Sequence, residues 1–129
     1  MNQDVELAKK ARFNACPEDN DFQVGAVLRT KEGKIYTGCN VKNDGIQSIC
    51  AERTAFVKAL SEGERKFDRI TIVGAEKGKE PDEECMPCGY CRQFMYEYVD
   101  KNFKICVVDK DGNIKEYTIE ELLPEAYDS

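Results

Sequence analysis

The sequence predicts an α/β protein with three layers, in which helices cover both faces of a mixed sheet of about five strands. The chain has 129 residues, 41% of them hydrophobic, which is typical of one compact domain. Its apolar residues alternate between helical and strand spacing in the order αββαβαββα. No repeat or linker-like tract interrupts this order, so we expect residues 1–129 to form a single domain.

The first half of the chain is expected to form a helix, two strands and a second helix. Apolar residues at helical spacing predict a helix over 3–15. Phe22–Leu28 and Ile35–Cys39 are β-prone and enclose a glycine-containing turn, which predicts an antiparallel hairpin. Ser48 is the expected N-cap of the next helix, whose first turn would carry Cys50.

The second half is expected to add three strands and two helices. Arg69–Ala75 is a continuous apolar run, typical of a buried strand. A helix is predicted from Cys88 to about Val99, because a proline precedes it directly. Strands follow at Phe103–Val108 and Ile114–Tyr117 on either side of a turn, and a short helix at Ile119–Leu123.

Composition excludes several classes of function. With 19 Lys+Arg against 25 Asp+Glu the net charge is -6, so we expect no nucleic-acid partner. The N-terminal segment has no long apolar run, so we expect no membrane association and a cytoplasmic protein. The absence of histidine removes Ser-His triads and imidazole metal sites, which leaves thiolates or carboxylates to bind any metal.

Three of the seven cysteines form a candidate metal site. Cys88 and Cys91 are a Cys-x-x-Cys pair at the start of a predicted helix. Cys50 begins another helix, and one intervening strand allows the two helix N-termini to meet. The positive ends of the helix dipoles would lower the pKa of the thiols and stabilise three thiolates around Zn²⁺. We expect Arg53 and Arg92 to offset the remaining negative charge.

A site with three protein ligands leaves the fourth zinc position for water, as in catalytic zinc centres. Glu52 is then the expected acid–base group beside that water. An alternative remains open, because Cys85 would complete a four-thiolate structural site with Cys50 and the Cys88 pair. That arrangement would make the protein a non-enzymatic, zinc-stabilised binding domain. The remaining cysteines are predicted to be small buried residues: Cys16, Cys39 and Cys106.

The residues around these cysteines resemble the paired zinc motifs of the short, three-cysteine cytidine deaminases. The two motifs are Cys50-Ala51-Glu52-Arg53-Thr54-Ala55 and Pro87-Cys88-Gly89-Tyr90-Cys91-Arg92-Gln93. Phe22–Ala26, Gly38–Asn40 and Glu120–Pro124 resemble further segments of that family. The resemblance implies a cytidine deaminase-like fold and one zinc ion per subunit. It also implies a hydrolase of pyrimidine salvage that converts cytidine or 2′-deoxycytidine to the uracil nucleoside and ammonia.

The same resemblance implies roles for individual residues. Water activated by zinc would attack C4 of the pyrimidine, while Glu52 carries its proton to N3 and later to the departing amino group. Phe22 would lie against the base, Asn40 at the ribose, and the backbone of Ala51 would also face the base. Tyr127 resembles a C-terminal aromatic that reaches a neighbouring subunit's pocket, which implies a homotetramer.

The sequence departs from the family pattern around the sugar. Where typical members have Asn-x-Glu-Asn, this chain has Asn40-Val41-Lys42-Asn43, so a cation replaces the carboxylate expected to bind ribose hydroxyls. The following loop, 44–49, is also shorter than usual. The sequence therefore leaves a second substrate class open, another aminopyrimidine nucleoside such as blasticidin S.

Overall fold

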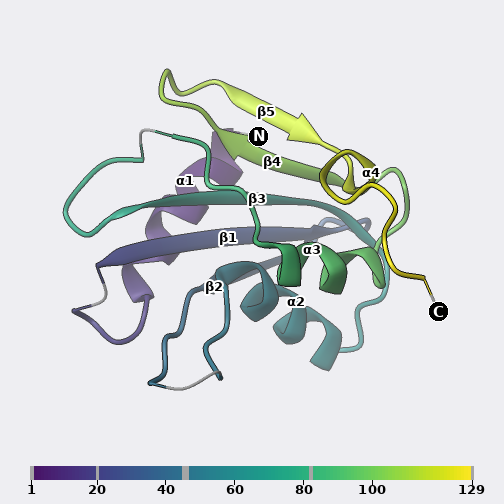
Figure 1. The fold of residues 1–129 in the computed structure, drawn as a ribbon, viewed down its shortest axis with the longest axis horizontal. Helices are drawn as coiled ribbons and strands as arrows, with labels where there is room; N and C mark the ends of the chain where they lie inside the picture. Colours follow the sequence, from purple (N-terminus) through teal and green to yellow (C-terminus); the bar gives the residue numbers. More distant parts are fainter. Residues whose placement is uncertain (1, 20, 45–46, 82, 129) are drawn as a thin grey trace.

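The computed structural model describes residues 2–19, 21–44, 47–81 and 83–128. Its centre is a five-stranded sheet in the order β2-β1-β3-β4-β5 (Figure 1). The strands are β1 (Phe22–Thr30), β2 (Ile35–Cys39), β3 (Phe67–Glu76), β4 (Lys104–Val108) and β5 (Ile114–Tyr117). The helices are α1 (Asn2–Ala11), the 3-10 turn η1 (Arg12–Asn14), α2 (Ala51–Ser61), α3 (Gly89–Tyr96) and α4 (Ile119–Leu122).

The sheet is mixed, as predicted. β1 pairs antiparallel with both β2 and β3, and β4 pairs antiparallel with β5. β3 and β4 are parallel, because α3 carries the chain back between them. α1 lies on one face of the sheet, and α2 and α3 lie on the other (Figure 1). The predicted three-layer α/β class is confirmed.

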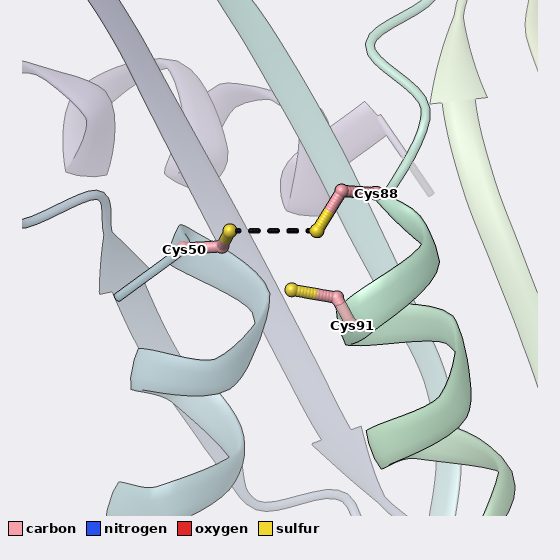
Figure 2. Close-up of side chains that lie close together, drawn as sticks. All are labelled: Cys50, Cys88 and Cys91. Carbon is pink, nitrogen blue, oxygen red and sulfur yellow. Dashed lines mark hydrogen bonds between the residues drawn. The ribbon is translucent and has the colours of Figure 1, made fainter. Parts of the chain in front are cut away.

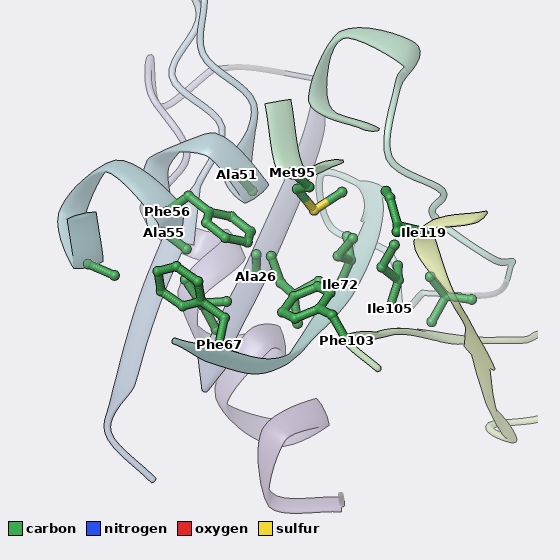
Figure 3. Close-up of a cluster of buried hydrophobic side chains, with 14 of the residues drawn as sticks. Ala26, Ala51, Ala55, Phe56, Phe67, Ile72, Met95, Phe103, Ile105 and Ile119 are labelled. Carbon is green, nitrogen blue, oxygen red and sulfur yellow. The ribbon is translucent and has the colours of Figure 1, made fainter. Parts of the chain in front are cut away.

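The larger core lies between the sheet and the α2–α3 layer (Figure 3). Phe56 of α2 is fully buried at its centre, and its ring lies 5.1 Å from that of Phe67, centroid to centroid. The rings of Phe94 and Phe103 lie 6.2 and 6.0 Å away. Aromatic pairs at these separations add to the energy of burial, so Phe56 fixes α2 against both α3 and the sheet.

The α1 face has a smaller core and a buried ion pair. Asp4 is fully buried, and its carboxylate accepts hydrogen bonds from Arg29 at 2.7 Å and from Arg69 at 3.0 Å. Burial by itself would raise the pKa of Asp4, but the hydrogen bonds and charges of Arg29 and then Arg69 outweigh it and lower the pKa. This network ties α1 to β1 and β3.

The start of α2 is corrected by the structure. Cys50, with φ -76° and ψ 158°, is the N-cap residue, whereas Ser48 was expected there. The hydroxyl of Ser48 instead accepts a hydrogen bond from the Asn43 backbone at 2.9 Å. Ile49 pairs with Val41 as an isolated antiparallel bridge, which keeps the chain extended up to Cys50. Of the predicted 44–49 loop, residues 45 and 46 lie outside the described part of the chain.

Two other expectations are resolved by the fold. The helix predicted over 3–15 ends at Ala11 and continues as the 3-10 turn η1. Among the cysteines expected to be buried, Cys106 is buried and Cys39 is partly buried, but Cys16 is exposed. Cys16 lies outside the main sheet, in a surface segment that forms a single bridge with Val41.

Among the described residues, no helix is both long and apolar enough to cross a membrane.

Candidate zinc and catalytic site

Three sulfur atoms meet where α2 and α3 begin. Cys50 and Cys88 are the N-cap residues of α2 and α3, and Cys91 lies in the first turn of α3 (Figure 2). The Sγ atoms of Cys50 and Cys88 are 3.7 Å apart, and all three sulfurs lie within 4.8 Å of one another. Tetrahedral zinc with Zn–S bonds of about 2.3 Å requires S–S separations of about 3.8 Å. The arrangement therefore fits a zinc ion.

The close approach of Gly38 to α2 helps to place Cys50. A Cβ atom at Gly38 would lie only 2.4 Å from the carbonyl oxygen of Ala51, the first residue of the helix. Only glycine therefore allows β2 and the start of α2 to come this close.

The electrostatics of the three sulfurs suit a cation. The pKa of Cys50 is lowered to about 5, chiefly by the hydrogen bond from Cys91 and further by Cys88 and Arg53, although burial opposes the shift. The pKa of Cys91 is raised, because this thiol donates to Cys50 and is itself buried. Without a metal, one negative charge is thus held on Cys50 by its neighbours. A divalent cation would favour ionisation of all three thiols.

Glu52 lies in the first turn of α2, and its carboxyl group interacts with Cys50 and Cys91. Its side chain is buried, at 4% exposure. Burial raises the pKa of Glu52 to about 7, and the negative charge of Cys50 contributes to the rise. A carboxyl group with this pKa exchanges protons readily near neutral pH.

The two arginines occupy different environments. The Arg53 guanidinium stacks on the ring of Tyr90 at 4.5 Å and donates to the carbonyl of Ser48 at 3.1 Å. From there its charge contributes to the low pKa of Cys50. Arg92 donates to the backbone carbonyls of Pro87 and Leu122, both at 2.7 Å, and so ties the start of α3 to α4. Its predicted charge-balancing role stays a prediction.

Cys85 lies near the cluster but outside it. Among the described residues, only the three predicted ligands form a group compact enough for a metal ion. Burial raises the pKa of Cys85 to about 12, and the charges of Glu52 and Cys50 contribute to the rise. The geometry thus favours the three-ligand site over the four-thiolate alternative.

Gly74 in β3 is a site residue that sequence reasoning missed. A Cβ atom there would lie 2.6 Å from the Cys85 sulfur and 3.0 Å from the edge of the Phe22 ring. Phe22 and Cys85 therefore meet over Gly74. A glycine inside a strand often marks such a close approach, so a signal was present in the sequence.

Asn40 and Lys42 lie on the Phe22 side of the site. The Asn40 side chain accepts from the backbone of Val24 at 2.9 Å and donates to the carbonyl of Phe22 at 3.0 Å, which fixes the start of β1. Phe22 and Lys42 both line a cleft of about 400 Å³. Asn40 and Lys42, which the sequence places near the sugar, thus both lie close to the start of β1.

Within a single chain, Tyr127 lies away from the cleft that Phe22 and Lys42 line. Its side chain is 73% exposed, and its backbone carbonyl accepts from Gln93 of α3 at 3.1 Å. It lines a separate cleft of about 500 Å³ beside α3 and α4.

A thiolate zinc site at two helix starts, with a buried carboxyl group beside it, defines the class of zinc-dependent deaminases. Comparison with known proteins agrees. The family model "Cytidine and deoxycytidylate deaminase zinc-binding region" matches residues 1–107. The chain therefore belongs to this family of zinc-dependent hydrolases.

Individual relatives support the assignment. The chain is 39% identical to a cytidine deaminase of Sporosarcina psychrophila, over 95% of this chain and 88% of the relative. It is 34% identical to a blasticidin-S deaminase of Bacillus cereus, over 97% of this chain and 92% of the relative. The crystal structure of the cytidine deaminase from Burkholderia pseudomallei superposes with a TM-score of 0.84 at 37% identity, covering 98% of both chains.

Proposed function

We propose that this protein deaminates cytidine and 2′-deoxycytidine hydrolytically, giving the uracil nucleosides and ammonia in pyrimidine salvage. The observation that carries the proposal is the buried Glu52, whose carboxyl group interacts with Cys50 and Cys91, together with three sulfurs spaced for zinc. The comparisons agree with it, since cytidine deaminases resemble this chain over nearly its whole length.

In this reaction Cys50, Cys88 and Cys91 hold the zinc ion. Zinc held there would act as a Lewis acid and lower the pKa of a bound water molecule. Glu52 takes the proton from the attacking water, delivers it to ring N3 and then protonates the departing amino group. The proposal is supported by the pKa of about 7, which lets Glu52 both accept and release a proton near neutral pH.

The surrounding residues orient the nucleoside. Phe22 packs against the base, and the backbone of Ala51 faces it at the start of α2. Asn40 lies at the ribose, where its side chain also holds the backbone of Phe22 in place. Arg53 offsets the excess negative charge of the thiolates, because its cation already acts on Cys50.

At the level of the whole protein, residues 1–129 act as one domain of a cytoplasmic homotetramer. Tyr127 supports the assembly, because it is exposed in the single chain and lies away from its own zinc cluster. In the assembly this aromatic contributes to a neighbour's site.

A second candidate substrate is blasticidin S. Lys42 stands where typical family members carry a carboxylate, and a blasticidin-S deaminase is among the relatives. Two cytidine deaminases are 39% and 40% identical to this chain, against 34% for the blasticidin-S deaminase, which favours the first candidate.

The purified protein should be offered cytidine, 2′-deoxycytidine, cytosine and blasticidin S while loss of the substrate's absorbance is followed. We expect turnover of the two cytosine nucleosides, and little turnover of free cytosine because it lacks the sugar that Asn40 holds. Turnover of blasticidin S alone would establish the second candidate in place of the first.

A further inference from the structure

An aromatic ring links the two helix starts that carry the cysteine ligands. Tyr90 lies in the first turn of α3, and Arg53 lies in the first turn of α2. The central guanidinium carbon of Arg53 lies 4.5 Å from the centroid of the Tyr90 ring, which is within the range of a cation–π interaction. This contact therefore joins α2 to α3 at the end where the three sulfurs meet (Figure 2).

The places of both residues in the sequence couple this contact to the metal site. Tyr90 stands between Cys88 and Cys91, so a displacement of its backbone moves two of the three ligands. Arg53 lies in the helical turn that begins at Cys50, the third ligand. The contact between ring and guanidinium thus connects the ligand pair on α3 with the single ligand on α2.

Arg53 also interacts with ligands from both helices. Its guanidinium interacts with the sulfurs of Cys91 and Cys50. Because Cys91 belongs to α3, Arg53 reaches from its own helix to the ligand that follows Tyr90. A shift of the guanidinium would therefore change the surroundings of two ligands at once. Groups that contact metal ligands from outside orient them, and their removal commonly weakens metal binding.

The hydrogen bonds of Arg53 leave its guanidinium free to tilt. The Nη2 atom donates to the carbonyl of Ser48 at 3.1 Å, whereas the Nε atom is buried and has no hydrogen-bond partner among the described residues. A guanidinium has five N–H donors in a fixed plane, and a bond from one terminal nitrogen does not fix that plane. The Tyr90 ring covers the guanidinium and restricts the remaining motion.

The exposure of Tyr90 distinguishes this contact from core packing. The Tyr90 side chain is 70% exposed, whereas Phe56, which also lies between α2 and α3, is fully buried. Burial of apolar area stabilises a fold roughly in proportion to the area removed from water. Tyr90 therefore contributes little to the stability of the fold, and its contact with Arg53 can be removed without opening the core.

We propose that Tyr90 is a positioning residue of the zinc site, which holds Arg53 against the sulfurs and keeps the starts of α2 and α3 at the separation that zinc requires. The inference rests on the zinc site of the proposed function. Tyr90 acts through Arg53 and requires no contact with the substrate. A ligand set that is already held in place binds its metal more tightly, because less freedom is lost on binding.

Zinc affinity measured without substrate tests this role. Reduced, metal-free protein is titrated with zinc in competition with a chromophoric chelator, which gives the Kd for zinc. We expect Tyr90→Ala to raise this Kd about tenfold. Tyr90→Phe should stay within about twofold of the unmodified protein, because a phenyl ring also binds a cation through its face. Tyr90→Leu keeps an apolar side chain but no ring, so it should match Tyr90→Ala and replaces it if that variant does not fold.

A double-mutant cycle tests whether Tyr90 acts through Arg53. In the Arg53→Gln background, adding Tyr90→Ala should change the Kd for zinc by less than about twofold, since the cation that the ring holds is already gone. Tyr98→Ala is the matched control, because Tyr98 is also exposed and its ring lies 5.0 Å from that of Phe94 instead of against a cation. This control should keep the zinc affinity of the unmodified protein. Full additivity in the cycle, or an equal loss of affinity in the control, would overturn the role of Tyr90.

Two outcomes separate this inference from the proposed function. Unchanged zinc affinity in Tyr90→Ala and Tyr90→Leu would overturn the positioning role alone, because deamination by the unmodified protein does not depend on that result. Unmodified protein that binds zinc but deaminates neither cytidine nor 2′-deoxycytidine would overturn the proposed function, while the zinc affinities of the variants would still decide the role of Tyr90.

Discussion

At the scale of single residues, Glu52 is the side chain that is expected to move protons in the proposed reaction. A glutamate in the first turn of an exposed helix would only complement the helix dipole. Here it is buried beside three sulfurs, and its pKa is raised to about 7. It therefore combines the position and the proton affinity of a general acid–base group.

We expect Glu52→Gln to lower kcat for cytidine on the order of 10³-fold, because the amide cannot carry a proton between water, N3 and the leaving group. Zinc content should stay at that of the unmodified protein, since Glu52 is not one of the three sulfur ligands. Steady-state kinetics together with elemental analysis check this. A variant that keeps zinc and more than a tenth of the wild-type kcat would contradict the role.

The two neighbouring cysteines, Cys85 and Cys88, should respond differently to the same substitution. Cys88→Ser removes a ligand and should abolish tight zinc binding, whereas Cys85→Ser should retain one zinc per chain. Zinc measured by atomic absorption after dialysis distinguishes them. Loss of zinc from both variants would instead support the four-thiolate site.

At the scale of secondary-structure elements, the sequence predicted the order of helices and strands because their apolar periods are distinct. Ile35–Cys39 and Ile114–Tyr117 have the predicted limits, and a turn that contains a glycine, Gly33 or Gly112, marks where each strand begins. The start of α2 was wrong by two residues because the Ile49–Val41 bridge, a non-local contact, overrides the capping preference of Ser48. The Cys-x-x-Cys spacing predicted Cys88 and Cys91 as ligands. The position of Cys85 could not be predicted in this way, because its contact with Gly74 depends on the packing of a loop against β3.

The Asp4 network predicts how α1 is held to the sheet. Asp4→Asn leaves Arg29 and Arg69 without their buried partner, so we expect the free energy of unfolding to fall by about 3 kcal/mol. Since the pKa of Asp4 is lowered by folding, its contribution is present above the unfolded pKa and is lost as pH falls through the folded pKa. Urea unfolding between pH 7 and pH 3 should therefore show a smaller acid destabilisation in the variant. An equal acid destabilisation in both proteins would contradict this.

At the scale of the whole molecule, the exposed Tyr127 is the residue through which the proposed assembly into a homotetramer can be tested. If it completes a neighbouring subunit's site, the protein should sediment at equilibrium as four chains, and Tyr127→Ala should raise KM for cytidine several-fold. A monomer with full activity would contradict the proposed homotetramer.

The fold as a whole serves to bring two helix starts together on one side of a sheet. Phe56 packs α2 against α3, and Gly38 lets α2 approach β2 closely. Cys50 and the Cys88–Cys91 pair thereby meet although they are distant in the sequence. We propose that this meeting point is a catalytic zinc site.

Zinc titration of activity tests that claim most directly. Reduced protein is stripped with a chelator, zinc is added in fractions of an equivalent, and the initial rate of cytidine deamination is measured at each step. We predict no activity without zinc and a linear rise that ends at one equivalent per chain. Full activity in the metal-free protein, or one bound equivalent without any deamination, would contradict the account.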